Sequence, residues 1–277
     1  MAFHNIFSPT SYYIYLTKKS ISYIVLYYNV SIGEKKMNSL YIVMPAYNEE
    51  ANIEEVIASW YPVLSDKCPN SKLVVADSGS SDNTHQILIN LTKKYDKLEV
   101  ISNTAKEHGP KVIALYDYAI KNKIDYVFQT DSDGQTNPEE FQHFWDCRKD
   151  YDGIFGNRPK RGDGFSRLLV EKVVCIILKL YFNVNIPDAN APFRLMNTTV
   201  LEKYLYKLSP TYALPNIVIS MYYSYYKEKC TYKTITFKPR QGGNNSINLP
   251  KIFSFGVHSL KDFKLIKKEM NLNKKEI

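Results

Sequence analysis

The chain has 277 residues, 44% of them hydrophobic, so it can bury a sizeable core in one large domain with appendages. Its four cysteines are scattered without a C-x-x-C pair, which excludes a disulfide framework and a cysteine zinc site and favours a reducing cytoplasm. Much of the net charge of +8 comes from the two ends of the chain. That distribution suits an anionic membrane surface or plain solubility at least as well as a nucleic acid, and we expect no nucleic-acid partner.

The first part of the chain is aromatic and basic. Lys18 and Lys19 interrupt its apolar stretch, and no apolar span reaches the ~18–20 residues that a transmembrane helix needs, so we expect neither such a helix nor a signal peptide. We expect residues 1–36 to lie outside the domain, and Met37, just before the first strand, is a candidate for the natural start. The domain would span residues 37–249, followed by a basic amphipathic helix within residues 250–277.

Beyond Met37, short apolar runs alternate with helix-like segments at intervals of roughly 30 residues, as in βαβ units. This alternation predicts an α/β fold with a mostly parallel central sheet flanked by helices, and ligand binding at the carboxyl ends of the strands. The expected strands are Leu40–Met44, Lys72–Ala76, Leu98–Ile101, Tyr126–Gln129 and Tyr232–Phe237, and the expected helices are Glu49–Ser65, Ser81–Tyr95, Lys111–Asn122 and two segments within 165–184 and 211–230.

Polar residues follow three of these strands. The runs are PAYNE from Pro45, DSGSSDNT from Asp77 and DSDGQ from Asp131, and none contains a lysine. Any one of them could be a simple turn, but three at the same sheet edge indicate a binding site. The phosphate-binding loops G-x-G-x-x-G and G-K-[ST] do not follow the first strand, which argues against a dinucleotide or P-loop protein.

Asp131 and Asp133 stand two residues apart at the tip of a buried strand, so both can project toward one point beyond the sheet edge. A divalent cation at that point would relieve their repulsion. Oxygen ligands suit Mg²⁺ or Mn²⁺, which bind through one or two carboxylates plus substrate phosphates. Such a metal would neutralise a departing diphosphate, and Asp77 could accept hydrogen bonds from a nucleobase. The pattern predicts a nucleotide-sugar site.

The stretches IVMPAYNEEANIEEVI, VVADSGSSDNT, TDSDGQTNPEE, GNRPKRG and DANAPFRLM resemble, in this order, the motifs of family-2 glycosyltransferases with the GT-A fold. The resemblance covers about residues 38–250 and is nearest to the polyprenyl-phosphate, dolichol-phosphate mannose synthase-like group. It implies inverting transfer from a UDP- or GDP-sugar with a divalent cation. It also implies nucleotide-sugar binding by Pro45, Tyr47, Glu49, Asp77, Asp131 and Gln135, metal binding by Asp131 and Asp133, and a phosphate-approaching role for Arg158.

The acceptor half departs from that group. Ala191-Pro192 replaces glycines before Phe193-Arg194, and the R-x-x-G-x-S-K loop is matched only loosely by Arg240, Gly243 and Ser246. A hydroxyl acceptor needs a general base, for which Asp188 is the candidate, unless it is a structural partner of Arg194. A phosphate acceptor is already anionic and needs only positioning by cations, for which the candidates are Arg158, Arg161 and Arg167. Both acceptor types remain open, and Arg167 is also a candidate for the donor site.

Two apolar segments are candidates for contact with a membrane surface. The helix expected within 165–184 is a core helix or a surface helix at a bilayer. The one after Leu249 mixes lysines with Ile252, Phe253, Phe255, Leu260, Phe263 and Ile266, the pattern of an amphipathic helix that lies in a membrane interface or packs on the domain. We therefore expect a cytoplasmic glycosyltransferase, with possible peripheral contact to the cytoplasmic membrane face, acting on a lipid phosphate or glycan in cell-envelope or glycoconjugate synthesis. Two alternatives are a metal-dependent nucleotidyltransferase or phosphotransferase, and a degenerate nucleotide-binding protein.

Overall fold

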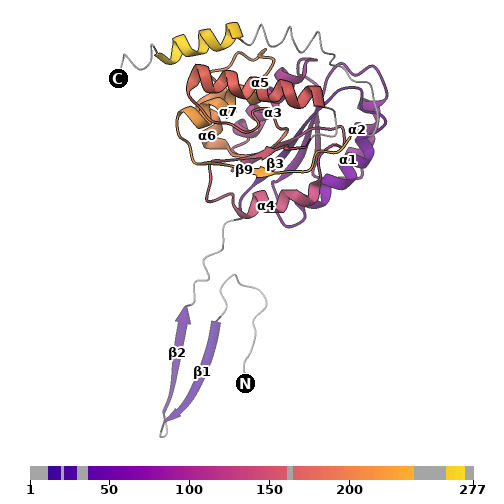
Figure 1. The fold of residues 1–277 in the computed structure, drawn as a ribbon. Helices are drawn as coiled ribbons and strands as arrows, with labels where there is room; N and C mark the ends of the chain where they lie inside the picture. The colour runs from indigo at the N-terminus through magenta and orange to yellow at the C-terminus, as the bar shows by residue number, and fades with distance from the viewer. Residues whose placement is uncertain (1–11, 20–21, 30–36, 161–164, 240–259, 272–277) are drawn as a thin grey trace. The chain divides into compact units, whose positions relative to one another are not determined.

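The computed structural model describes residues 12–19, 22–29, 37–160, 165–239 and 260–271 (Figure 1). The chain divides into two compact units, residues 1–37 and residues 38–277. The first unit contains an antiparallel hairpin of β1 (Tyr12–Lys19) and β2 (Ser22–Asn29), which the sequence pattern did not predict. None of the helices in the described ranges has the length and apolar composition needed to cross a membrane.

The second unit is built on a seven-stranded sheet with the order β5-β4-β3-β6-β8-β7-β9. The neighbours β5, β4, β3 and β6 are parallel, β8 is antiparallel to both β6 and β7, and β9 is parallel to β7. The expected mixed α/β fold with a mostly parallel sheet is confirmed. The strands are β3 (Leu40–Ala46), β4 (Lys72–Asp77), β5 (Leu98–Ile101), β6 (Tyr126–Thr130), β7 (Gly153–Asn157), β8 (Phe193–Asn197) and β9 (Cys230–Thr234).

Helices cover both faces of this sheet, because successive side chains of a strand point to opposite sides. Along β3, Tyr41 and Val43 enter one hydrophobic cluster while Ile42 and Met44 enter the other. The first cluster is completed by α3 (His108–Lys121), α5 (Phe165–Phe182), α6 (Thr198–Leu205), α7 (Pro215–Tyr225) and the helix of residues 260–271. The second is completed by α1 (Ile53–Trp60), α2 (Thr84–Thr92) and α4 (Phe141–Asp146), on the other side of the sheet (Figure 1).

The predicted helices exist but differ at their ends. Helix α1 is shorter than the predicted Glu49–Ser65, because residues 47–52 form the turn after β3 and Pro62 leads into the 3₁₀ turn Tyr61–Leu64. Helix α2 likewise begins at Thr84 rather than at Ser81, and α3 begins at His108, three residues before the predicted start. Strand β5 has the predicted bounds, and β9 begins at Cys230, two residues before its predicted start.

Strands β7 and β8 were not predicted from the sequence. Strand β7 is short and contains two glycines, and β8 carries the fully buried Arg194. The Arg194 guanidinium donates to the carbonyl oxygens of Ala189, Ala191 and Asn216 at 3.1–3.2 Å. A charge satisfied in this way can lie inside a sheet, but its carbonyl partners come from residues that are distant in the sequence or in a loop.

Candidate active site

The candidate site lies where the order of the parallel strands reverses. From β3 the chain moves to β4 and then β5 on one side, and it returns to β6 on the other side of β3. At such a switch point the connections leave in opposite directions, which opens a crevice beyond the carboxyl ends of the two central strands. The run starting at Pro45 spans the end of β3 and the one starting at Asp131 follows β6, so the fold brings together strand ends that the sequence singled out.

Hydrogen bonds fasten the loop after β3 to the loop after β4. The backbone N–H of Asn48 donates to Ser80 Oγ at 3.0 Å, and that of Glu49 donates to Thr84 Oγ1 at 2.8 Å. The backbone N–H of Ser81 donates in turn to Asn48 Oδ1 at 2.8 Å. Asn48 has a φ of 54°, a left-handed conformation that asparagine tolerates better than most residues. The serines and threonine of the second loop therefore shape the first.

Asp77, the candidate nucleobase-binding residue, is held at the end of β4. It is 2% exposed, and its Oδ2 lies 3.1 Å from His85 Nδ1. Its Oδ1 accepts a hydrogen bond from the hydroxyl of Ser80. Its carboxylate is thus oriented by two neighbours, one of which, Ser80, also binds the loop after β3.

The acidic loop after β6 is tied to β3. The hydroxyl of Ser132 donates to the carbonyl of Pro45 at 2.8 Å, which places Asp131 and Asp133 on either side of this anchor. Asp131 Oδ1 lies 3.4 Å from His108 Nε2, and Asp133 Oδ1 accepts from the backbone N–H of Gln135. The turn needs a glycine, because residue 134 has a φ of 73°.

The residues of this loop fit a divalent cation of the Mg²⁺ or Mn²⁺ type. Asp131 and Asp133 are both partly exposed and offer only oxygen ligands. Among the described residues, no group of three or more His, Cys, Asp or Glu side chains could enclose a metal. The protein would therefore supply one or two carboxylates, and the remaining ligands would be substrate phosphate oxygens and water, as is usual for Mg²⁺.

Two lysines of the second unit reach this edge of the sheet, although the three strand-end runs contain none. The Nζ atoms of Lys106 and Lys111 lie 5.0 and 5.3 Å from the centre of the Tyr47 ring. Lys111, on α3, is 1% exposed and donates to the carbonyl of Ala46. Burial lowers the pKa of Lys111 to about 8, although the charge of Asp77 acts in the opposite direction. The sequence signal that could have pointed to Lys111 was a lysine placed among the apolar residues of the predicted helix.

Gln135, expected to bind the nucleotide sugar, has a local partner. The side-chain amide of Gln135 donates to the backbone carbonyl of Lys238 at 2.8 Å, and the backbone carbonyl of Gln135 accepts from the backbone N–H of Lys238. It is 3% exposed. Gln135 thus connects the acidic loop to the segment after β9, which precedes residues 240–259. The loose loop match at Arg240, Gly243 and Ser246 lies outside the described residues.

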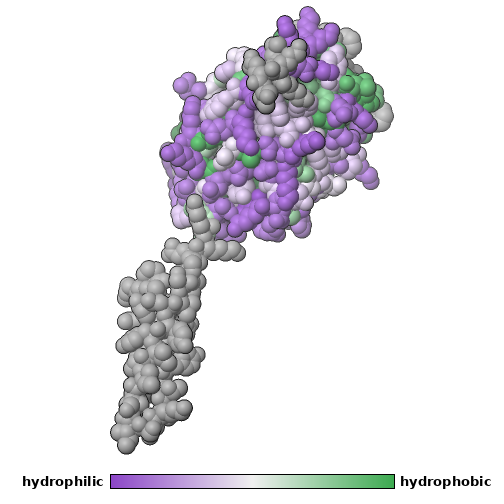
Figure 2. Space-filling model, turned by 90° about the vertical axis from the view of Figure 1, so that its left-hand side faces the viewer, coloured by the Kyte–Doolittle hydropathy of each residue, from purple (hydrophilic) through white to green (hydrophobic). Residues whose placement is uncertain are grey.

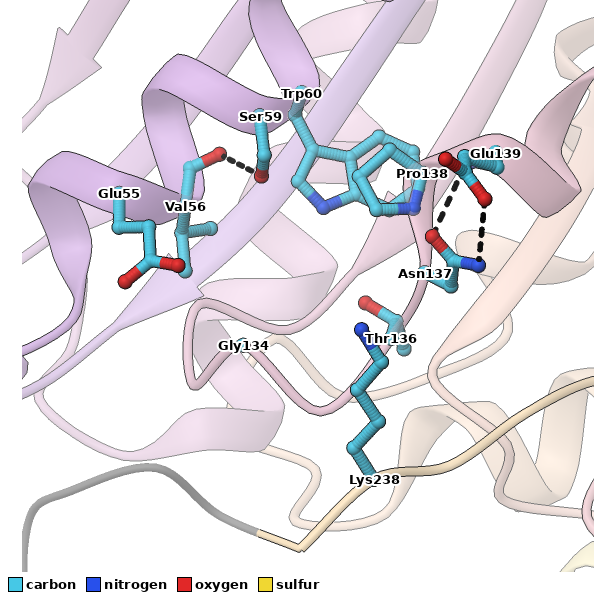
Figure 3. Close-up of a pocket in the computed structure, with 10 residues that line it drawn as sticks. All are labelled: Glu55, Val56, Ser59, Trp60, Gly134, Thr136, Asn137, Pro138, Glu139 and Lys238. Carbon is cyan, nitrogen blue, oxygen red and sulfur yellow. Dashed lines mark hydrogen bonds between the residues drawn. The ribbon is translucent and has the colours of Figure 1, made fainter.

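A pocket of about 280 Å³ opens between α1 and this acidic loop (Figure 3). Its wall contains Gly134 and Thr136 from the loop, Trp60 from α1 and Lys238. Asn137 and Glu139 point toward each other at one side of it, where the Asn137 side chain both accepts from and donates to Glu139. The pocket adjoins the candidate metal residues without containing their carboxylates.

Arg158 and Asp188, the candidate residues for the acceptor, bind each other. Arg158 Nε donates to Asp188 Oδ2 at 2.8 Å and Nη2 donates to Oδ1 at 2.9 Å, while the residues are 4% and 2% exposed. The Arg158 guanidinium also lies 3.8 Å from Glu171 on α5, and Glu171 accepts from the backbone N–H of Ala189 at 2.7 Å. The structure therefore gives Asp188 a different arginine partner from the Arg194 that the sequence suggested.

This buried cluster changes what its members can do. Both Asp188 carboxylate oxygens accept hydrogen bonds from the Arg158 guanidinium, so a general base at Asp188 would have to act from within this contact. Arg158 is engaged in the same way, so its charge is already balanced before any phosphate arrives. Arg167 lies near the start of α5, and Arg161 lies outside the described residues.

Comparisons with known proteins identify the family of the chain. Residues 41–205 match the family described as glycosyl transferase family 2. An uncharacterised glycosyltransferase of Synechocystis sp. is 26% identical over 232 residues, which cover 82% of this chain and 70% of the relative. Polyprenol monophosphomannose synthase of Mycolicibacterium smegmatis is 26% identical over 170 residues, which cover 58% of this chain and 63% of the synthase.

A solved structure shows the same architecture. Glucosyl-3-phosphoglycerate synthase from Mycobacterium tuberculosis, in complex with Mn²⁺, UDP-glucose and glycerol 3-phosphate, superposes with a TM-score of 0.55 at 20% identity. The match covers 75% of this chain and 73% of the synthase. At this identity the likeness bears on the fold, and it confirms the expected GT-A architecture.

Proposed function

The chain belongs to glycosyltransferase family 2, and from this we propose that it transfers a sugar from a UDP- or GDP-sugar to a polyprenyl phosphate. Family membership and the glycosyltransferases among its relatives make the chain a glycosyltransferase and set aside the nucleotidyltransferase and degenerate-binder alternatives. The proposal concerns the donor, the acceptor and the roles of individual residues.

The donor half rests on the convergence of three loops at the β3–β6 switch point. In the proposed complex, the base and ribose bind against Tyr47, Glu49 and Asp77, and the diphosphate lies over the acidic loop. Asp131 and Asp133 would hold a divalent cation, which when bound would neutralise the negative charge of the departing diphosphate. Lys106 and Lys111 add positive charge beside Tyr47, where they would favour an anionic ligand.

The acceptor half rests mainly on the Arg158–Asp188 pair. A hydroxyl acceptor requires a base, and the candidate base Asp188 is occupied by Arg158. A phosphate monoester requires none, because one of its oxygens is already anionic. In the proposed reaction this oxygen attacks the anomeric carbon of the sugar, the bond from that carbon to the diphosphate breaks with inversion, and the nucleoside diphosphate leaves. The mycobacterial relative, named as a polyprenol monophosphomannose synthase, supports an acceptor of this class.

The contacts among Arg158, Glu171 and Asp188 then serve to position the loop of residues 187–191 on α5. Arg158, Glu171 and Asp188 join the loop of residues 187–191 to α5, and Lys172 on α5 donates to the carbonyl of Pro187 at 3.0 Å. Arg161 lies outside the described residues and Arg158 is paired with Asp188, so we propose Arg167 as the arginine that contacts the acceptor phosphate.

Donor choice is tested by incubating the purified chain with Mn²⁺ and either UDP-sugars or GDP-sugars, and by identifying the released nucleotide. We expect a nucleoside diphosphate from one of the two donor classes. Release of a nucleoside monophosphate would instead show cleavage between the two phosphates and would contradict glycosyl transfer from this site.

A further inference from the structure

The outer face of α5 carries an apolar stripe that the rest of the described domain does not cover. Leu169, Val173, Ile176 and Leu180 are 55%, 47%, 56% and 77% exposed. They are separated by four, three and four residues, so they share one side of the helix, along about 16 Å of its axis. Most large hydrophobic residues of an α/β domain are buried, and an ordered row of exposed ones marks an interaction surface.

The charges around this stripe are positive. Lys172 and Lys179 are exposed and border one edge of it, seven residues apart. The acidic residue of α5, Glu171, is 7% exposed and turned toward Arg158, away from the stripe. Because α5 presents apolar side chains flanked by lysines and no exposed carboxylate, it has the composition of a helix that lies in the plane of an anionic bilayer.

The helix of residues 260–271 extends this surface without using its own apolar side. Phe263, Ile266 and Met270 are 2%, 9% and 5% exposed and belong to the core. The Phe263 ring packs on Phe182 at the end of α5, with 5.9 Å between ring centres. Of the two expectations for this helix, the contacts of Phe263 and Ile266 agree with packing on the domain, while Ile252, Phe253 and Phe255 lie outside the described residues.

What this helix exposes beside α5 is mainly basic. Lys261, Lys264, Lys267 and Lys268 are exposed, together with Leu265 at 60%. Lys267 Nζ lies 5.8 Å from the ring of Tyr181 on α5. Figure 2 shows hydrophobic residues gathered at the upper right of the domain, next to hydrophilic residues at its top, at the level of α5 and residues 260–271 in Figure 1.

We infer that the exposed stripe of α5, bordered by the lysines of α5 and of residues 260–271, docks the enzyme on an anionic lipid bilayer. A second copy of the chain fits less well, because an antiparallel symmetric contact through this stripe would bring together the edges of the two helices that carry Lys172 and Lys179. The inference rests on the proposed function in one respect: a polyprenyl phosphate resides in a bilayer. Because Glu171 and Lys172 contact the loop of residues 187–191, the docked helix would hold that loop near the lipid surface.

The test is co-sedimentation of the full chain with vesicles of phosphatidylcholine alone or mixed with phosphatidylglycerol, at low and high salt. We expect binding to the anionic vesicles that weakens with salt. The variant Ile176→Ser/Leu180→Ser should bind about tenfold more weakly or worse. Both side chains are largely exposed, so its melting temperature should equal that of the native chain. The control Ile89→Ser removes an exposed apolar side chain of α2 and should bind as the native chain does.

Failure of this inference can be told from failure of the proposed function. Transfer to a short-chain, water-soluble prenyl phosphate needs no bilayer, so the double variant should retain it. Native-like vesicle binding by the double variant, or absence of binding by the native chain, would overturn the docking surface even if soluble transfer persists. A change from dimer to monomer in the double variant would also overturn it and would identify the stripe as a contact between copies.

Discussion

Arg158 and Asp188 form a two-point contact inside the protein, with Nε–Oδ2 and Nη2–Oδ1 distances of 2.8 and 2.9 Å. The sequence offered these two residues for different acceptors, Asp188 as a base for a hydroxyl and Arg158 as a cation for a phosphate. Their mutual contact weakens the case for a base more than the case for a phosphate acceptor, because a phosphate oxygen needs no deprotonation.

Asp188→Asn should therefore act mainly on stability. It leaves a buried guanidinium without its carboxylate, so we expect the free energy of unfolding to fall by about 3–5 kcal/mol in urea titrations. The exposed control Asp150→Asn should change it by about 0.5 kcal/mol or less. If Asp188→Asn instead keeps its stability and loses turnover selectively, and the fall in rate toward acidic pH disappears, Asp188 is a general base.

Asp133→Asn should abolish most of the activity and leave the fold intact. Loss of one carboxylate at the proposed cation site removes a stabiliser of the departing charge, and about 10²–10³ in rate is a usual loss. Chelation of divalent cations should have a similar effect on the native chain. Glu139→Gln, an exposed carboxylate at the adjacent pocket, is the control. Near-native turnover by Asp133→Asn with metal present would show that Asp133 does not bind the catalytic cation.

Lys111 should make stability depend on alkaline pH. The pKa of its side chain is lowered to about 8 in the folded protein from an ordinary 10.5, mainly by burial, so the unfolded chain binds more protons between these values. Stability should therefore rise as the pH increases from about 8 toward 10.5, because the charged form is disfavoured inside the protein below this range. Urea midpoints of Lys111→Met should lack this rise, and equal slopes for both proteins would show that Lys111 is not the cause.

Deletion of residues 1–36 should leave donor binding and the melting temperature of the domain unchanged. The sheet of the second unit begins with β3 at Leu40, and residues 1–37 form a unit of their own. The measurement is a thermal melt with and without nucleotide sugar and Mn²⁺. A large drop in melting temperature on truncation would show that the first residues stabilise the domain.

The parallel half of the sheet was predictable from the sequence because its signals are local. Apolar runs from Leu40 and from Lys72 mark buried strands, and the acidic run after β6 marks a ligand-binding edge. Strand β8 was not predictable in this way, since its buried Arg194 is satisfied by carbonyls of the preceding loop and by that of Asn216, 22 positions away.

Contacts in both halves of the candidate site depend on the tertiary structure as well. The pairing of Arg158 with Asp188 joins residues 30 positions apart, and Lys111 reaches Ala46 across 65 positions. Neither contact follows from periodicity or from a motif. The direction of the helix of residues 260–271 is another example, because an amphipathic pattern does not specify whether its apolar side faces a domain or a bilayer.

The most direct test of the proposed function follows a labelled sugar from its nucleotide donor. The native chain is incubated with the active UDP- or GDP-sugar, Mn²⁺ and a polyprenyl phosphate, and label in the organic phase is compared with nucleoside diphosphate in the aqueous phase. We predict that the two products form in equal amounts, that the label is attached through the lipid phosphate, and that Asp133→Asn forms both about 10²–10³ times more slowly. Turnover of the donor with all of the label left in the aqueous phase and none on the lipid phosphate would contradict the account.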